Sequence, residues 1–173
     1  MEVQYSNIVH FPFYSDVRKN EQQKALRLLL TNKTIFIEST FGSGLLKFIG
    51  STLSHYLSKI NFIKVNLEGC ITQIQVEEKI LADTNLSISA LLLHINDALK
   101  TPFCIILERI SPKISDDTLN YLLRLSSDFR VKNQNIYFIF SSAKKIEQLA
   151  YFTVTLEKLT PLEIKTILIT KYG

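Results

Sequence analysis

The segment Thr34-Ile-Phe-Ile-Glu-Ser-Thr-Phe-Gly-Ser-Gly-Leu-Leu-Lys-Phe-Ile-Gly50 runs from an apolar strand through a glycine-containing loop into a helix. Three of the five glycines of the chain, Gly42, Gly44 and Gly50, lie within it. In a P-loop, this order of elements places backbone amides and the N-terminus of the helix around phosphate oxygens. The segment therefore predicts a phosphate-binding backbone after the first strand.

The side chains of this loop depart from the P-loop pattern G-x-x-x-x-G-K-[ST], which aligns with residues 39–46. Ser39 stands at the first glycine position, and Leu45 and Leu46 replace the lysine that reaches the β/γ phosphate oxygens and the hydroxyl that binds Mg²⁺. What remains is the set of backbone amides at Gly42, Ser43 and Gly44. We expect a vestigial nucleotide site that does not bind Mg-ATP tightly.

Short apolar runs alternate with helix-length stretches along the rest of the chain. The pattern predicts strands at 34–38, 61–67, 102–108, 135–141 and 152–156, and helices at 20–30, 44–58, 71–81, 87–100, 115–129 and 144–151, with a final helix that begins at Pro161 and is capped by Thr160. The third run is apolar at every position from Phe103 to Leu107, so helices should cover both faces of the sheet. The expected fold is α/β, a doubly wound and mostly parallel five-stranded sheet of the P-loop NTPase type.

The ends of the third and fourth predicted strands supply the other candidate residues of a P-loop site. Glu108 stands where the carboxylate that organises Mg²⁺ is expected, and Arg109 takes the place of the acid that activates water. A guanidinium does not act as a general base at neutral pH. In the alternative interpretation, Glu108 is a strand-end carboxylate that pairs with Arg109 or with a lysine. Ser142 ends the fourth strand where related ATPases place a polar residue that senses the γ-phosphate, although hydroxyls are common in any loop.

The composition is that of an ordinary globular protein. With 173 residues, 46% of them apolar and 21% charged, and a net charge of +4, the chain is expected to form one domain over residues 1–173. The cysteines and histidines lack the spacing of a metal site, and the basic residues form no cluster that would predict nucleic-acid binding. No apolar run reaches the roughly 18 residues of a membrane span, and no signal peptide is visible, so the expected location is the cytoplasm.

Segments at both ends of the chain add a resemblance to a known family. Phe11-Pro12-Phe13 precedes the predicted helix with Gln22-Gln23-Lys24-Ala25-Leu26, and the fifth predicted strand is followed by Pro161-Leu162. Together with the strand and loop layout, these segments resemble the AAA+ ATPases of the general secretion pathway A type, whose relatives include the N-terminal domain of the cell-division protein DamX. The resemblance covers nearly the whole chain, and the Walker motifs of the family are degenerate in this sequence.

The resemblance implies an ATPase core that is completed by a helical lid and by an arginine of a neighbouring subunit. Because the chain ends one helix after the fifth predicted strand, the lid is expected to be absent and the chain to be part of a longer protein, such as the cytoplasmic domain of a membrane-anchored one. The departures at Leu45, Leu46 and Arg109 remove the phosphate, metal and base functions together.

The expected function is that of a catalytically inactive AAA+-like domain, a pseudo-ATPase that serves as a protein-interaction or assembly module of a cell-envelope or secretion system. The expected partners are other protein subunits, copies of this chain among them, without a small-molecule substrate and without a cofactor. Two alternatives stay open. One is a nucleotide-binding regulatory switch or weak ATPase within an oligomer, and the other is a DNA-associated AAA+ subunit.

Overall fold

The apolar runs of the sequence form one parallel sheet. The computed structural model describes residues 17–40, 44–54, 60–97, 102–132 and 135–172. In this part of the chain, the strands are β1 (Thr34–Ser39), β2 (Asn61–Asn66), β3 (Phe103–Glu108), β4 (Ile136–Ser142) and β5 (Thr153–Leu156). They lie in the order β2-β3-β4-β1-β5, and every neighbouring pair is parallel. The predicted fold class is confirmed.

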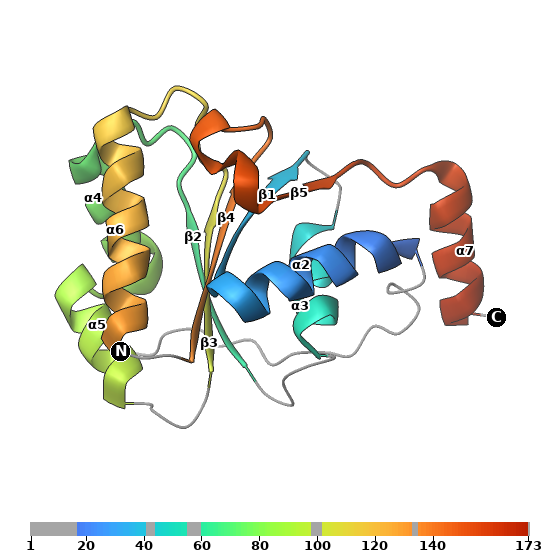
Figure 1. Ribbon diagram of the computed structural model, residues 1–173, viewed down its shortest axis with the longest axis horizontal. Coiled ribbons are helices and arrows are strands. Elements are labelled where there is room, and N and C mark those ends of the chain that lie inside the picture. The colour runs from blue at the N-terminus through green and yellow to red at the C-terminus, as the bar shows by residue number, and fades with distance from the viewer. Residues whose placement is uncertain (1–16, 41–43, 55–59, 98–101, 133–134, 173) are drawn as a thin grey trace.

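Helices cover both faces of this sheet, as the apolar run of β3 predicts (Figure 1). One face carries α2 (Lys19–Asn32) and α3 (Leu45–Ser54), and the other carries α4 (Gln73–Thr84), α5 (Ile88–Asp97) and α6 (Asp116–Lys132). A short 3₁₀-helix, η1 (Glu147–Phe152), precedes β5, and α7 (Pro161–Tyr172) follows it.

Alternation of side chains along each strand builds two apolar layers. In β1, Ile35 and Ile37 face α2 and α3, whereas Phe36 between them faces the α4–α6 side. On the α4–α6 side, the ring of Phe138 packs edge-on against Phe129, with ring centroids 5.8 Å apart. Each such side chain stabilises the fold by about 1.5–3 kcal/mol through its burial. The core therefore fixes the positions at which the strands end.

One predicted helix is wrong in type. The stretch 144–151 was expected to be an α-helix, but the structure has the 3₁₀-helix η1 there. Ile146 and Leu149 are buried three residues apart, and the amide of Leu149 donates to the carbonyl of Ile146 at 2.9 Å. An apolar spacing of three residues matches the period of a 3₁₀-helix, which places both side chains on the same side.

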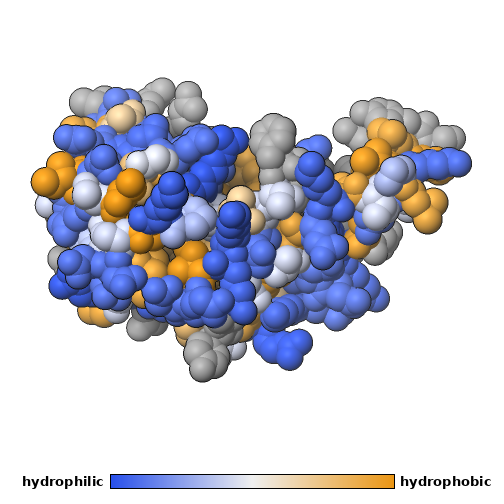
Figure 2. Space-filling view, turned by 90° about the horizontal axis from the view of Figure 1, so that it is seen from above, coloured by the Kyte–Doolittle hydropathy of each residue, from blue (hydrophilic) through white to orange (hydrophobic). Residues whose placement is uncertain are grey.

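The last helix, α7, extends away from the body of the domain (Figure 1). Its start is capped as predicted: the amide of Glu163 donates to the Thr160 hydroxyl at 3.2 Å, and the Glu163 carboxylate accepts from the Thr160 amide at 2.6 Å. Ile167 packs against the core on the α2–α3 side. Other large apolar side chains of α7 are exposed, and Figure 2 shows apolar surface on this arm: Leu162, Ile164, Leu168 and Ile169.

None of the helices in the described residues combines the length and the apolar character that a membrane crossing requires.

Candidate functional site

A cavity of about 500 Å³ opens at the carboxyl ends of β1, β3 and β4. In this strand order, the connection from β1 leads to the far edge of the sheet and the chain later returns to place β4 beside β1. Ligands of α/β proteins bind at such switch points, outside the carboxyl ends of the strands. Most of the predicted site residues meet here: Ser39, Gly44, Leu45, Glu108, Arg109 and Ser142.

The other three predicted site residues are Gly42, Ser43 and Leu46. Gly42 and Ser43 lie outside the described residues. Leu46 is 47% exposed on the first turn of α3 and does not contribute to the cavity wall. Lys47, the next residue, is also exposed on this turn. The position of the missing Mg²⁺-binding hydroxyl is therefore an apolar surface.

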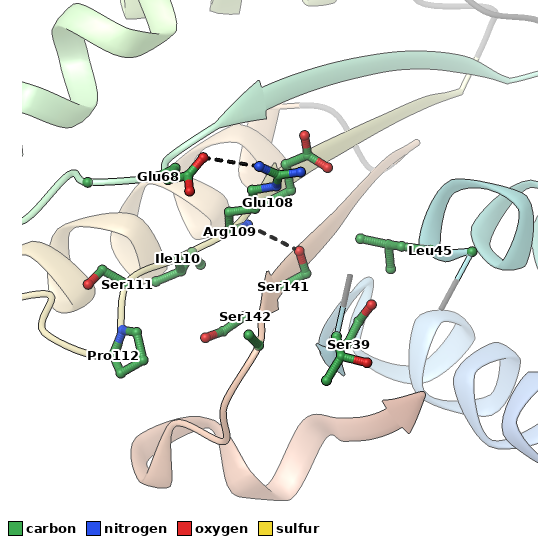
Figure 3. Close-up of a pocket in the computed structure, with 14 residues that line it drawn as sticks. Ser39, Leu45, Glu68, Glu108, Arg109, Ile110, Ser111, Pro112, Ser141 and Ser142 are labelled. Carbon is green, nitrogen blue, oxygen red and sulfur yellow. Dashed lines mark hydrogen bonds and ion pairs between the residues drawn. The ribbon is translucent and has the colours of Figure 1, made fainter. Parts of the chain in front are cut away.

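The end of the P-loop segment keeps a helix start without the phosphate-binding lysine. Gly44 has a φ of 77°, a conformation that favours glycine, and its carbonyl accepts the first helical hydrogen bond from the amide of Phe48 at 2.9 Å. Leu45 is half-buried, packs partly against the α2–α3 core and extends from the start of α3 toward the cavity (Figure 3). An isobutyl group thus occupies the place from which a lysine would reach phosphate.

Glu108 pairs with a lysine, as one of the two sequence interpretations holds. Its carboxylate lies 3.5 Å from the ammonium of Lys64 on the neighbouring strand β2. The Glu108 side chain is only 18% exposed, whereas that of Lys64 is 51% exposed. The carboxylate at the metal-organising position is therefore in the cavity wall and already has a cationic partner.

Arg109 turns the chain at the end of β3. It adopts a left-handed conformation with a φ of 58°, its amide donates to the Ser141 hydroxyl at 3.4 Å, and the next amide, of Ile110, donates to the Ser141 carbonyl at 2.8 Å. The Arg109 guanidinium lies 3.0 Å from the carboxylate of Glu68, and the two side chains lie together on one side of the cavity (Figure 3). Arg109, predicted to replace a water-activating acid, thus pairs with an acid from the β2–α4 connection.

The sequence reasoning missed Glu68, Gly69 and the role of Ser141. Glu68 and Gly69 form a turn directly after β2, where Gly69 has a φ of 79°. A Glu-Gly pair after a predicted strand is a turn signal that points to the same edge of the sheet as the P-loop. Ser142 lines the cavity as predicted, but its hydroxyl is buried and accepts from the amide of Lys144 at 3.3 Å.

The cavity carries more negative than positive charge. Glu68 and Glu108 line it together with Arg109, while the Lys64 ammonium lies outside the lining. Within the residues that the structure describes, histidine, cysteine and acidic side chains form no group of three that could hold a metal ion. His94 lies on α5, and His10 and His55 are outside the described residues.

Comparisons with known proteins identify the fold. No protein-family model and no curated protein matches the chain. Among solved structures, Cdc6p of Pyrobaculum aerophilum is similar with a TM-score of 0.60 at 14% identity, over 88% of this chain and 48% of its own. The Orc1 protein of Aeropyrum pernix in complex with DNA gives 0.55 at 16% identity, over 89% and 48%. A RuvB variant of Thermotoga maritima gives 0.53 at 13% identity, over 89% and 48%.

The chain has the fold of AAA+ P-loop ATPases. It spans about half the length of these neighbours, with 48% of each covered. The likeness to the general secretion pathway A and DamX-like type, like the degenerate character of the Walker motifs, stays a prediction from the sequence.

Proposed function

We propose that this chain is a catalytically inactive AAA+-fold domain that acts as a protein-interaction or assembly module. The proposal rests on the side chains of the cavity at the carboxyl ends of β1, β3 and β4, which we call the carboxyl-edge cavity. There, Leu45 stands in place of the phosphate-binding lysine, and Arg109, paired with Glu68, stands in place of the water-activating acid. Each substitution removes a different function of an ATPase site.

The described side chains of the cavity offer little attraction for a triphosphate. Hydrogen bonds to charged groups contribute about 1.5–3 kcal/mol each, and the leucine side chain of Leu45 forms none. Glu68 and Glu108 are paired with Arg109 and Lys64, so these two cations are already partnered by carboxylates and do not replace the missing lysine as free partners of phosphate. The loss of one such hydrogen bond weakens binding about 10- to 100-fold.

The groups around the cavity do not supply a base for hydrolysis. Arg109 stays protonated and donates to Glu68 at 3.0 Å. Glu108 lies 3.5 Å from the Lys64 ammonium, an ion pair that directs its carboxylate toward β2. Neither group is placed to take a proton from water in the middle of the cavity.

An interaction role is supported by the exposed apolar side chains of α7. Leu162 is 73% exposed and Ile169 is 58% exposed on one side of the helix, and Leu168, at 51%, lies on another side. A helix with apolar residues on several sides is normally covered by other protein. The proposed partners are other protein subunits, and the cell-envelope or secretion context rests on the family resemblance alone.

The proposal is tested by calorimetric titration with Mg-ATP and by a phosphate-release assay. We expect no binding tighter than about 1 mM, near −4 kcal/mol, and no release above the buffer rate. Gly44→Val, which places a branched side chain at the left-handed position beside the cavity, is the control. Micromolar binding and turnover that disappear in Gly44→Val would overturn the proposal.

A second candidate, a nucleotide-binding switch without hydrolysis, is favoured by one observation. The cavity remains open at about 500 Å³ even though Leu45 extends toward it. The same titration separates the two functions, because the switch requires saturable micromolar binding of Mg-ATP or Mg-ADP without phosphate release.

A further inference from the structure

A second cavity, of about 610 Å³, lies beside the amino-terminal half of β1 on the side of the sheet that faces α6. Its walls come from the α2–β1 turn, β1, α6, β4 and η1. It is separate from the carboxyl-edge cavity, since no lining residue belongs to both. Cavities that bind small molecules have volumes of about 300–1,000 Å³ and mostly apolar walls with a few polar groups.

The floor of this second cavity is apolar. Phe36 of β1 and Phe140 of β4 form it together with Leu123 of α6 and Leu149 of η1. Phe152, at the end of η1, is 38% exposed at its edge. Because Phe36, Phe140 and Leu149 are at most 3% exposed, an apolar ligand chain would replace water mainly over Leu123 and Phe152, which favours its binding.

Arg130 of α6 brings a positive charge to the wall. Its Nε donates to the Ser126 carbonyl at 3.2 Å and its Nη1 donates to the Asn32 carbonyl at 2.5 Å. Both acceptors are uncharged, and no carboxylate in the described part of the chain forms an ion pair with Arg130. Lys33 does not share this role, because its ammonium lies 4.7 Å from the ring centroid of Tyr137, which belongs to the opposite face of the sheet.

Thr34, the first residue of β1, adds an unpaired hydroxyl. It precedes Phe36 by two residues, so its side chain points to the same face of the sheet. Its Oγ1 is buried and has no hydrogen-bond partner among the described residues. Buried hydroxyls nearly always have a hydrogen-bond partner in folded proteins, so an acceptor on a bound ligand would satisfy the Thr34 hydroxyl.

We propose that the second cavity binds a small apolar carboxylate, of the class of medium-chain acyl acids. The alkyl chain lies along Leu123 and Phe152, above the buried Phe36 and Phe140, and the carboxylate accepts hydrogen bonds from the Arg130 guanidinium and the Thr34 hydroxyl. An anion is selected because the charged groups of this wall, Arg130 and Lys33, are both cations without a carboxylate partner in the described part of the chain, and Arg130 is the one that is not held at Tyr137. The proposal does not depend on the function of the carboxyl-edge cavity.

The test is calorimetric titration of the full chain with decanoate below its micelle concentration, with decanol as the uncharged comparison. We expect a Kd on the order of 0.1 mM for decanoate, as ligand-efficiency limits allow. Decanol should bind at least about tenfold more weakly, because it lacks the charge-assisted hydrogen bonds.

Variants locate the binding. Thr34→Val keeps the shape of the side chain and removes the buried hydroxyl. It should weaken decanoate binding about fivefold without loss of thermal stability. Arg130→Gln should weaken it about tenfold or more, with folding checked by circular dichroism because the contact with Asn32 is lost. Leu162→Ser, on the exposed arm, should leave decanoate binding unchanged. Absence of decanoate binding, equal binding of decanol, or full binding by Thr34→Val would each overturn the proposal.

Discussion

Restoring the lysine at position 45 tests how far the loss of ATP binding depends on one side chain. Leu45→Lys places an ammonium at the start of α3, where the leucine side chain now extends toward the cavity (Figure 3). The four-carbon stem of lysine can keep part of the packing that Leu45 makes against the α2–α3 core. The variant should therefore fold with a loss of about 1 kcal/mol, roughly half of the burial energy of a leucine.

The expected gain in ATP affinity follows from the same geometry. One charge-assisted hydrogen bond to a phosphate contributes about 1.5–3 kcal/mol, which is a factor of about 10 to 100 in Kd. Glu108, only 18% exposed in the cavity wall, attracts the new ammonium when no nucleotide is present. This competition keeps the gain in ATP affinity near the lower end of that range. A Kd near 1 mM or weaker should thus fall to about 0.1 mM.

The assay is calorimetric titration with Mg-ATP, with thermal unfolding measured in parallel. Leu46→Lys is the matched control, because it adds the same charge one residue later, at a side chain that is 47% exposed and outside the cavity lining. Neither variant should hydrolyse ATP, since Arg109 still takes the place of the base. Equal gains in both variants, or a folded Leu45→Lys protein without any gain, would refute the reasoning.

Three further predictions concern stability and reactivity. Phe138→Ala, at a side chain that is 1% exposed, should lower the free energy of unfolding by about 3–5 kcal/mol in urea titrations, whereas Val131→Ala, at 82% exposure, should change it by less than about 0.5 kcal/mol. Hydrogen bonds from Thr160 lower the pKa of Glu163 below its ordinary value of 4.5, so the cap of α7 should be fully present above that pH and lost as the pH falls through the lowered value. Faster amide exchange in α7 at low pH would report this loss, and Glu163→Ala should show the faster exchange already at neutral pH. Burial raises the pKa of the Cys104 thiol, so a thiol reagent at neutral pH should modify it only after denaturant is added, and rapid native labelling would contradict the buried position.

Local chemistry made the elements predictable. β-Branched and aromatic runs in which every residue is apolar identify strands that are buried on both faces, and β3 and β4 follow this rule. The cap of α7 is predictable for the same reason, because Thr160 acts on an amide only three residues away. The prediction of an α-helix at η1 is wrong because the spacing of Ile146 and Leu149 fits an α-helix as well as a 3₁₀-helix.

The partners of the site residues were not predictable in the same way. Arg109 pairs with Glu68, 41 residues earlier in the chain, and Glu108 pairs with Lys64 on the adjacent strand β2. These pairs depend on the strand order, which places β2 beside β3 and brings the β2–α4 turn to the carboxyl edge. Periodicity along one strand contains no information on which strand lies next to it.

The sequence by itself determined the α/β fold class, the position of the P-loop segment, and the absence of lysine and hydroxyl at Leu45 and Leu46, since these depend on residue identity and local spacing. Only the tertiary structure decided that Leu45 extends toward the cavity while Leu46 faces solvent, that Arg109 is tied to Glu68, and that a second cavity lies beside β1. The physical reason is that side-chain direction, charge pairing and cavity shape arise from contacts between elements that are distant in the chain. Those contacts form only when the β2-β3-β4-β1-β5 sheet is assembled.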